Sequence, residues 1–98
     1  MKNNPISINH PPKNELKSIV DLINKNDLAS AERKSDKLTR TFKRSPILWN
    51  MHGITKMNLG KMDDAESAFN KACMLDSSFT DALFNKAHLE LTKNNFDS

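Results

Sequence analysis

The feature that most constrains the fold of this chain is a helix–turn–helix pattern of 34 residues, over positions 46–79. Trp49 and Gly53 are four positions apart, so they share one face of the first expected helix. Gly53 has no side chain, and a neighbouring helix can therefore approach it closely. Gly60 follows and favours the end of this helix, because glycine readily adopts the left-handed conformation found at helix C-termini.

The second helix of the pattern carries small and large residues on one face. Ala65, Phe69 and Ala72 are spaced by four and by three positions, which places them on the same side of a helix. One large ring between two small side chains is the arrangement that close helix–helix packing requires. The stretch therefore predicts two helices that pack tightly against each other.

The same frame extends upstream over residues 12–45. Apolar residues recur there at helical spacing in two segments, which predicts helices over 13–25 and 28–42. Ala31 precedes Ala65 by one full period and is the strongest sign of a repeat within the chain.

The other landmarks of this upstream unit are poor. In the aligned frame, the positions of Trp49, Gly53 and Phe69 are occupied by Glu15, Ile19 and Ser35. We therefore interpret residues 12–45 as a degenerate copy. Ser45 and Pro46 separate the two units, and Ser45 is a suitable N-cap for the next helix.

Downstream of residue 79 the frame starts again. Leu83 and Ala87 take up the positions of Trp49 and Gly53, and a turn between helices is expected at 94–97. The chain then ends before the second helix of this unit. We interpret this end as the truncation of a longer protein, the alternative being an array that a partner completes.

The pattern resembles the tetratricopeptide repeat (TPR), a helical hairpin with a period of 34 residues. The resemblance rests on Trp49, Gly53, Ala65, Phe69 and Ala72. It implies an all-α fold in which about five helices form antiparallel pairs stacked into a right-handed solenoid. The departures from the family pattern are His52 for Leu, Lys56 for Tyr and Ser77 for Pro.

This organisation divides the chain into two parts. Residues 1–11, with Pro5 and Pro11 among asparagine and serine and Pro12 directly after them, are expected to form a disordered lead-in. Residues 12–98 are expected to form one TPR-like domain. Its parts are a degenerate repeat over 12–45, a full repeat over 46–79 and a partial repeat over 80–98.

No combination of side chains in the sequence indicates catalysis, a cofactor or a metal ion. The histidines His10, His52 and His88 lie in different segments, and Cys73 is the single cysteine. Metal-binding spacings and a glycine-rich phosphate loop are both missing. We therefore expect this chain not to be an enzyme, and we interpret His52 and Cys73 as packing residues. A lone cysteine suits the reducing cytoplasm, and no apolar run approaches the ~20 residues of a membrane span.

The resemblance also implies a ligand-binding face. In TPR arrays the first helix of each pair lines a concave surface, and a protein or peptide ligand lies across it. On this sequence that surface would include Asn50, Met51, Ile54, Asn58, Asp81, Phe84, Asn85 and His88. Asparagine amides can hydrogen-bond a peptide backbone, and the apolar members can form pockets. For any one of these residues, packing in the core or plain exposure to solvent is as open an interpretation as ligand binding.

A second surface is a basic ridge formed by Arg33, Lys37, Arg40 and Arg44. At ~100° per residue these side chains fall within ~60° of one another, opposite the apolar stripe of the same helix. We interpret the ridge as a solvated outer face. Nucleic acid is not expected as a partner, because no stacking aromatic residues interleave with these cations.

Two functional hypotheses follow. The first is a non-catalytic protein–protein interaction module that binds a peptide or helix on its concave face. The second is the N-terminal substrate-recognition region of a larger enzyme, since bacterial TPR-linked sulfotransferases and the O-linked N-acetylglucosamine transferases look similar at their N-termini. A third, weaker hypothesis is self-association through the unpaired last helix, which would expose Leu83, Ala87 and Leu91.

Overall fold

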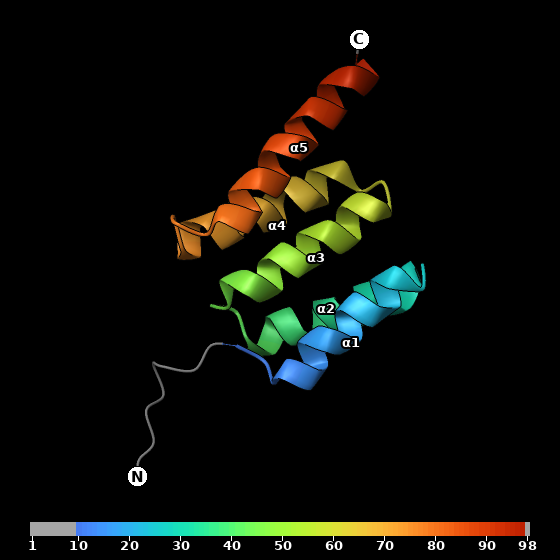
Figure 1. Ribbon diagram of the computed structural model, residues 1–98, viewed down its shortest axis with the longest axis vertical. Coiled ribbons are helices and arrows are strands. Elements are labelled where there is room, and N and C mark those ends of the chain that lie inside the picture. The colour runs from blue at the N-terminus through green and yellow to red at the C-terminus, as the bar shows by residue number, and fades with distance from the viewer. Residues whose placement is uncertain (1–9, 98) are drawn as a thin grey trace.

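The computed structural model describes residues 10–97, and these residues form five α-helices and no β-strand (Figure 1). The expectation of an all-α chain with about five helices is confirmed. The helices are α1 (Lys13–Asn24), α2 (Leu28–Thr41), α3 (Pro46–Asn58), α4 (Met62–Leu75) and α5 (Thr80–Asp97).

Local sequence explains where these helices begin and end. The Asp27 side chain accepts a hydrogen bond from the Ser30 N–H at the start of α2, and Ser45 accepts one from the Leu48 N–H at the start of α3. Such caps satisfy backbone donors that have no partner inside the helix. Gly60 follows α3 with a φ of +80°, a conformation that glycine adopts without steric cost.

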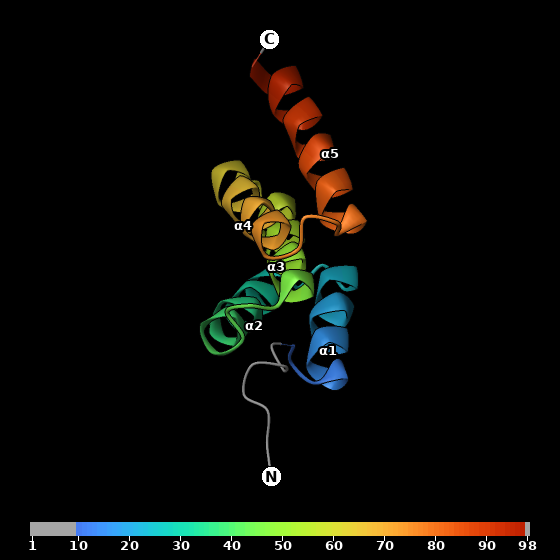
Figure 2. The ribbon, with the colours of Figure 1, turned by 90° about the vertical axis from the view of Figure 1, so that its left-hand side faces the viewer.

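The central helix of the fold is α3, which contacts both the upstream helices α1 and α2 and the downstream helices α4 and α5. Each helix packs against the next one along the chain; α1 also contacts α3, and α3 contacts α5, whereas α2 and α4 do not touch. Figure 2 shows α2 and α4 on one side of α3, with α1 and α5 on the other. As a result, α3 contacts each of the other four helices and borders both clefts described below.

The best-packed part of the molecule is the contact between α3, α4 and α5. Phe69 of α4 is fully buried with Ala65 and with Leu89 of α5. A Cβ atom placed on Gly53 would lie only 2.5 Å from the Phe69 ring, so the ring occupies the space that the missing side chain leaves. Trp49 is partly buried, and its indole N–H donates to the Lys43 carbonyl at 2.7 Å. The predicted close packing at Gly53 and Phe69 is confirmed.

In the upstream helix pair, α1 and α2, other types of residue are fully buried at the corresponding positions. Ala31 is fully buried, as is Ala65 one period later. Ile19 and Ser35 are fully buried as well, at the positions that Gly53 and Phe69 occupy in the next pair. The large side chain therefore lies on the first helix of this pair rather than on the second.

The turn expected at 94–97 is not present, because α5 continues to Asp97. Residues 80–98 contain neither glycine nor proline, so nothing interrupts the helix at Asn94. The expected lead-in falls mostly on residues 1–9, which lie outside the described residues. Its last two residues contact the fold: Pro11 is buried, and His10 Nδ1 lies 2.8 Å from Ser45 Oγ.

Across residues 10–97, none of the helices combines the length and the apolar character needed to cross a membrane.

Candidate functional site

A cleft between α3 and α5, here called the α3/α5 cleft, brings together most of the residues predicted to line the binding face. Its volume is about 420 Å³, and its lining residues are Asn50, Ile54, Thr80, Asp81, Phe84 and Asn85. Five of the eight predicted residues are among them. Thr80, in the first turn of α5, was not anticipated.

Two asparagine side chains join the walls of the cleft. The Asn85 amide nitrogen donates to the Asn50 side-chain oxygen at 3.0 Å, across α5 and α3. Asn50 is only 6% exposed, so this bond satisfies an oxygen that is largely shielded from water. The Asn85 side-chain oxygen and its second N–H keep the capacity to bond another group.

The rest of the lining combines an exposed ring with a carboxylate. Phe84 is 71% exposed, a large apolar surface for a side chain in water. Ile54 packs against the core cluster beneath the cleft, and Asp81 is exposed one turn before Asn85. The cleft therefore offers an apolar contact, amide hydrogen bonds and one negative charge.

Three predicted residues do not line the cleft. Asn58 and His88 lie about one helical turn beyond Ile54 and Asn85, where α5 diverges from α3 (Figure 1), and both are exposed. Met51 is partly buried on a neighbouring face of α3. The binding face drawn from the sequence is thus longer than the cleft, because two straight helices that cross at an angle stay close only over a short distance.

A polar cluster between α2 and α3 was not foreseen in the sequence; we call it the α2/α3 polar junction. Its members are Glu32, Ser35 and Asp36 of α2, His52 and Lys56 of α3, and Lys61 after α3. The Glu32 carboxylate accepts hydrogen bonds from Lys56 at 2.6 Å and from Lys61 at 2.7 Å. These two lysines hold the pKa of Glu32 down at about 2. Burial alone would lower the pKa of Lys56, but its bond to Glu32 and the nearby charge of Asp36 outweigh burial and raise it.

His52 completes this junction in its neutral form. Its Nδ1 lies 2.7 Å from Ser35 Oγ, and its Nε2 lies 3.4 Å from a carboxylate oxygen of Asp36. Burial lowers the pKa of His52, and this effect exceeds the opposing attraction of Asp36. The Ser35 hydroxyl, which shares this short hydrogen bond with Nδ1, also donates to the Glu32 carbonyl at 3.2 Å, so the imidazole is tied to α2 through a hydroxyl with two partners.

The signal for this junction was present in the sequence. His52 and Lys56 are the two departures from the family pattern inside α3, and they are four residues apart on one face. Glu32 and Asp36 show the same spacing on α2. The polar residues that replace apolar ones at this position therefore meet polar partners on the preceding helix.

In the part of the chain that the structure describes, the side chains that commonly bind metal ions are dispersed. Within residues 10–97, no group of three or more His, Cys, Asp or Glu side chains is placed to hold a metal ion. Cys73 is a free thiol, partly buried near the end of α4. The groups that line the α3/α5 cleft include an apolar ring, two amides and a carboxylate.

Comparisons of this chain with protein-family models, with curated proteins and with solved structures gave no match.

Proposed function

We propose that this chain is a TPR-like, non-catalytic interaction module that binds a peptide segment of a partner protein in the α3/α5 cleft. The observation that carries the proposal is the convergence of Phe84, Asn85 and Asp81 of α5 on Asn50 and Ile54 of α3. Covering a ring exposed to this degree removes apolar surface from water and therefore favours binding of a ligand.

The repeat character is supported by residues one period apart. Ala31 and Ala65 are both fully buried. Glu32 and Glu66, the residues that follow them, each form an ion pair with a lysine of the next helix. A stack of similar helix pairs leaves the first helices of the pairs side by side, as α1, α3 and α5 contact one another in turn.

The chemistry of the cleft determines which kind of peptide would bind there. An apolar side chain of the peptide covers Phe84 and reaches Ile54. A lysine or arginine of the peptide lies near Asp81, the charged residue of the lining. Asn85 bonds a backbone amide of the peptide, which gives affinity without demanding a particular side chain.

A display library of random peptides, selected against the intact chain, tests this function. We expect the enriched peptides to combine an apolar residue with a basic residue. Phe84→Ala should weaken their binding by about tenfold or more, because it removes a large ring from the contact area. Asp81→Asn should weaken the peptides with a basic residue and leave others unchanged.

Leu91→Ala is the matched control, since Leu91 is a 65% exposed apolar residue of the same helix outside the cleft. Neither substitution removes a buried side chain, so both variants should stay folded. Peptides that bind the Phe84→Ala and Leu91→Ala variants equally well would contradict the assignment of the cleft. A selection that enriches no peptide would contradict the function itself.

The single cysteine also leads us to propose a reducing compartment such as the cytoplasm as the place where the module acts.

A further inference from the structure

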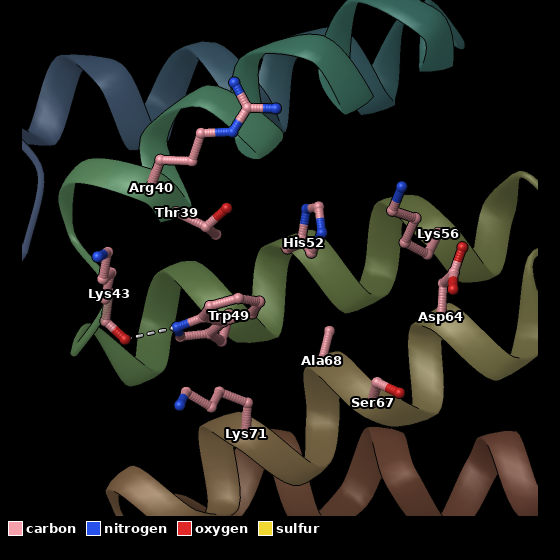
Figure 3. Close-up of a pocket in the computed structure, with 10 residues that line it drawn as sticks. All are labelled: Thr39, Arg40, Lys43, Trp49, His52, Lys56, Asp64, Ser67, Ala68 and Lys71. Atoms are coloured by element: carbon pink, nitrogen blue, oxygen red, sulfur yellow. Dashed lines mark hydrogen bonds between the residues drawn. The ribbon is translucent and has the colours of Figure 1, made fainter.

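A second cleft lies on the other side of α3, between α2 and α4; we call it the Trp49 cleft (Figure 3). Its volume is about 640 Å³, within the ~300–1,000 Å³ range of small-molecule sites. At ~100° per residue, its α3 residues lie about 140° around the helix from those of the α3/α5 cleft. It is lined by Thr39, Arg40, Lys43, Trp49, His52, Lys56, Asp64, Ser67, Ala68 and Lys71.

The charge of the Trp49 cleft is predominantly positive. Arg40, Lys43 and Lys71 are exposed, and among residues 10–97 none of them forms an ion pair. The fourth cation of the lining, Lys56, is already bound to Glu32. Asp64 is the one carboxylate of the lining. Three cations that line one cleft and have no ion-pair partner among residues 10–97 favour an anionic ligand.

The cleft also contains an aromatic ring that is held in place. The Trp49 indole N–H donates to the Lys43 carbonyl at 2.7 Å, and the ring meets His52 edge to face with centroids 5.6 Å apart. Figure 3 shows the ring between Lys71 on one side and Thr39 and Arg40 on the other. Because these contacts fix the ring before a ligand arrives, a flat group can stack on it with little ordering cost.

We propose that the Trp49 cleft binds one or two nucleotides of a single-stranded nucleic acid. A base stacks on Trp49, and the adjoining phosphates contact Arg40, Lys43 and Lys71. Sites of this kind combine a cationic groove with an aromatic ring. An acidic peptide would use the cations, but it has no need of the oriented ring, so the combination favours nucleic acid.

The proposal revises the sequence-based expectation that nucleic acid is not a partner. That expectation rested on the lack of stacking aromatic residues among the cations of the basic ridge. The fold supplies Trp49 from the following helix instead, in a cleft that Arg40 of the ridge also lines. Lys37 and Arg44 of the ridge are exposed on either side of Arg40 in the sequence and extend the cationic surface beyond the cleft.

The intrinsic fluorescence of the protein reports directly on this site, because Trp49 is the only tryptophan and the chain has no tyrosine. The probes are single-stranded oligothymidylate and oligouridylate of about ten nucleotides, a length typical of such sites. We expect both to quench the emission of Trp49. With three phosphate contacts, the logarithm of the association constant should fall with the logarithm of salt concentration with a slope of about −2.

Charge reversals separate the cleft from general attraction to a basic protein. Arg40→Glu and Lys71→Glu should each weaken binding on the order of tenfold and make the salt slope shallower. Lys13→Glu is the matched control: it changes the net charge equally at an exposed site on α1, outside the cleft. All three side chains are exposed, so the variants should fold.

Three results would overturn the proposal. The first is absence of binding and quenching at about 50 mM salt, where phosphate contacts are strong. The second is an equal loss of affinity for Lys13→Glu and the two cleft variants. The third is polyglutamate that binds as tightly as the oligonucleotides and is weakened equally by the cleft variants, which would assign the cleft to acidic peptides. None of these results bears on the α3/α5 cleft, which lies on another face of α3.

Discussion

The contact of α2 with α3 and the contact of α4 with α5 are stabilised by different interactions. Glu32 and Glu66 are one period apart, and each binds a lysine of the next helix, Lys56 at 2.6 Å and Lys93 at 3.1 Å. At the α2/α3 polar junction the lysine is almost fully buried. At the α4/α5 contact, the fully buried residue Leu89 packs with Phe69, and the ion pair is left at the edge.

The comparison shows that contacts between helices of one small fold can be stabilised in two ways. Apolar burial at α4 and α5 depends little on pH and salt. Buried charges at α2 and α3 contribute only while every partner keeps its proper charge. We therefore expect the upstream contact to respond to pH and to loss of a partner, and the downstream contact to respond to loss of volume.

A similar contrast exists within the helix pairs. Where α3 has Gly53 and α4 has Phe69, α1 has Ile19 and α2 has Ser35. The position of Trp49 is taken in α1 by Glu15, which forms an ion pair with Lys34 of α2 at 2.6 Å. At these positions, 34 residues apart, the two helix pairs thus place their large and charged side chains on different helices.

The largest effect is expected from removing the ring at the downstream contact. Phe69→Ala should lower the free energy of unfolding by about 3–5 kcal/mol, because it empties the space between α3, α4 and α5. Ser35→Ala, at the equivalent position of α2, should lower it by only about 1 kcal/mol, since it removes a hydroxyl bonded to His52. Urea unfolding followed by circular dichroism measures both, and equal losses would refute the difference between the two pairs.

Filling the gap at Gly53 should have the next largest effect. Gly53→Ala places a methyl group about 2.5 Å from the Phe69 ring and should cost about 1–3 kcal/mol, although alanine favours helices. Adding Phe69→Leu should recover part of this loss, because a smaller side chain admits the methyl group. A double-mutant cycle without coupling between the two positions would show that the ring does not need the gap.

Breaking the buried pair at the upstream contact should have a smaller effect. Lys56→Ala should lower the free energy of unfolding by about 1–2 kcal/mol, because Glu32 keeps Lys61 as a second partner. Lys93→Ala is the control at the exposed ion pair, and it should cost less than Lys56→Ala. If Lys93→Ala costs as much as Lys56→Ala, burial does not distinguish the two contacts.

The pH dependence should be the smallest effect and should come from the upstream contact. The pKa of His52 is lowered in the fold, so the unfolded chain binds its proton first and stability falls as pH drops below about 6.5. The depressed pKa of Glu32 adds a second loss between about 4.5 and about 2. Urea midpoints measured from pH 8 downward should show the first step, and His52→Gln should remove it. An increase of the urea midpoint as the pH falls from 6.5 to 5 would contradict the predicted direction.

Much of the fold followed from local pattern. The helices of the upstream pair begin and end within one residue of their expected bounds, and a neighbouring helix approaches Gly53 closely, as expected. Spacing within a helix and the conformational limits of Gly and Pro are enough for such predictions. The end of α5 was missed because Asn94 alone does not stop a helix whose preceding turn is held by the Lys93 ion pairs.

The candidate site was harder to predict from the sequence than the fold was. Which residues of α3 and α5 meet depends on the angle between the helices, so the sequence could not indicate that Met51, Asn58 and His88 lie outside the cleft. The partners of His52 and Lys56 are 17 and 24 residues away in the chain, and helical periodicity within one segment cannot identify them. The Trp49 cleft likewise needs α2, α3 and α4 in their folded positions.

The most direct test of the central claim is a nuclear magnetic resonance titration of the intact, isotopically labelled chain with a selected peptide. The account predicts that the side-chain amide signals of Asn50 and Asn85 and the ring signals of Phe84 shift together and saturate at one peptide per chain, while signals of Arg40 and Lys71 stay in place. Saturable binding whose largest shifts lie outside α3 and α5, with the two asparagine amides unmoved, would contradict it.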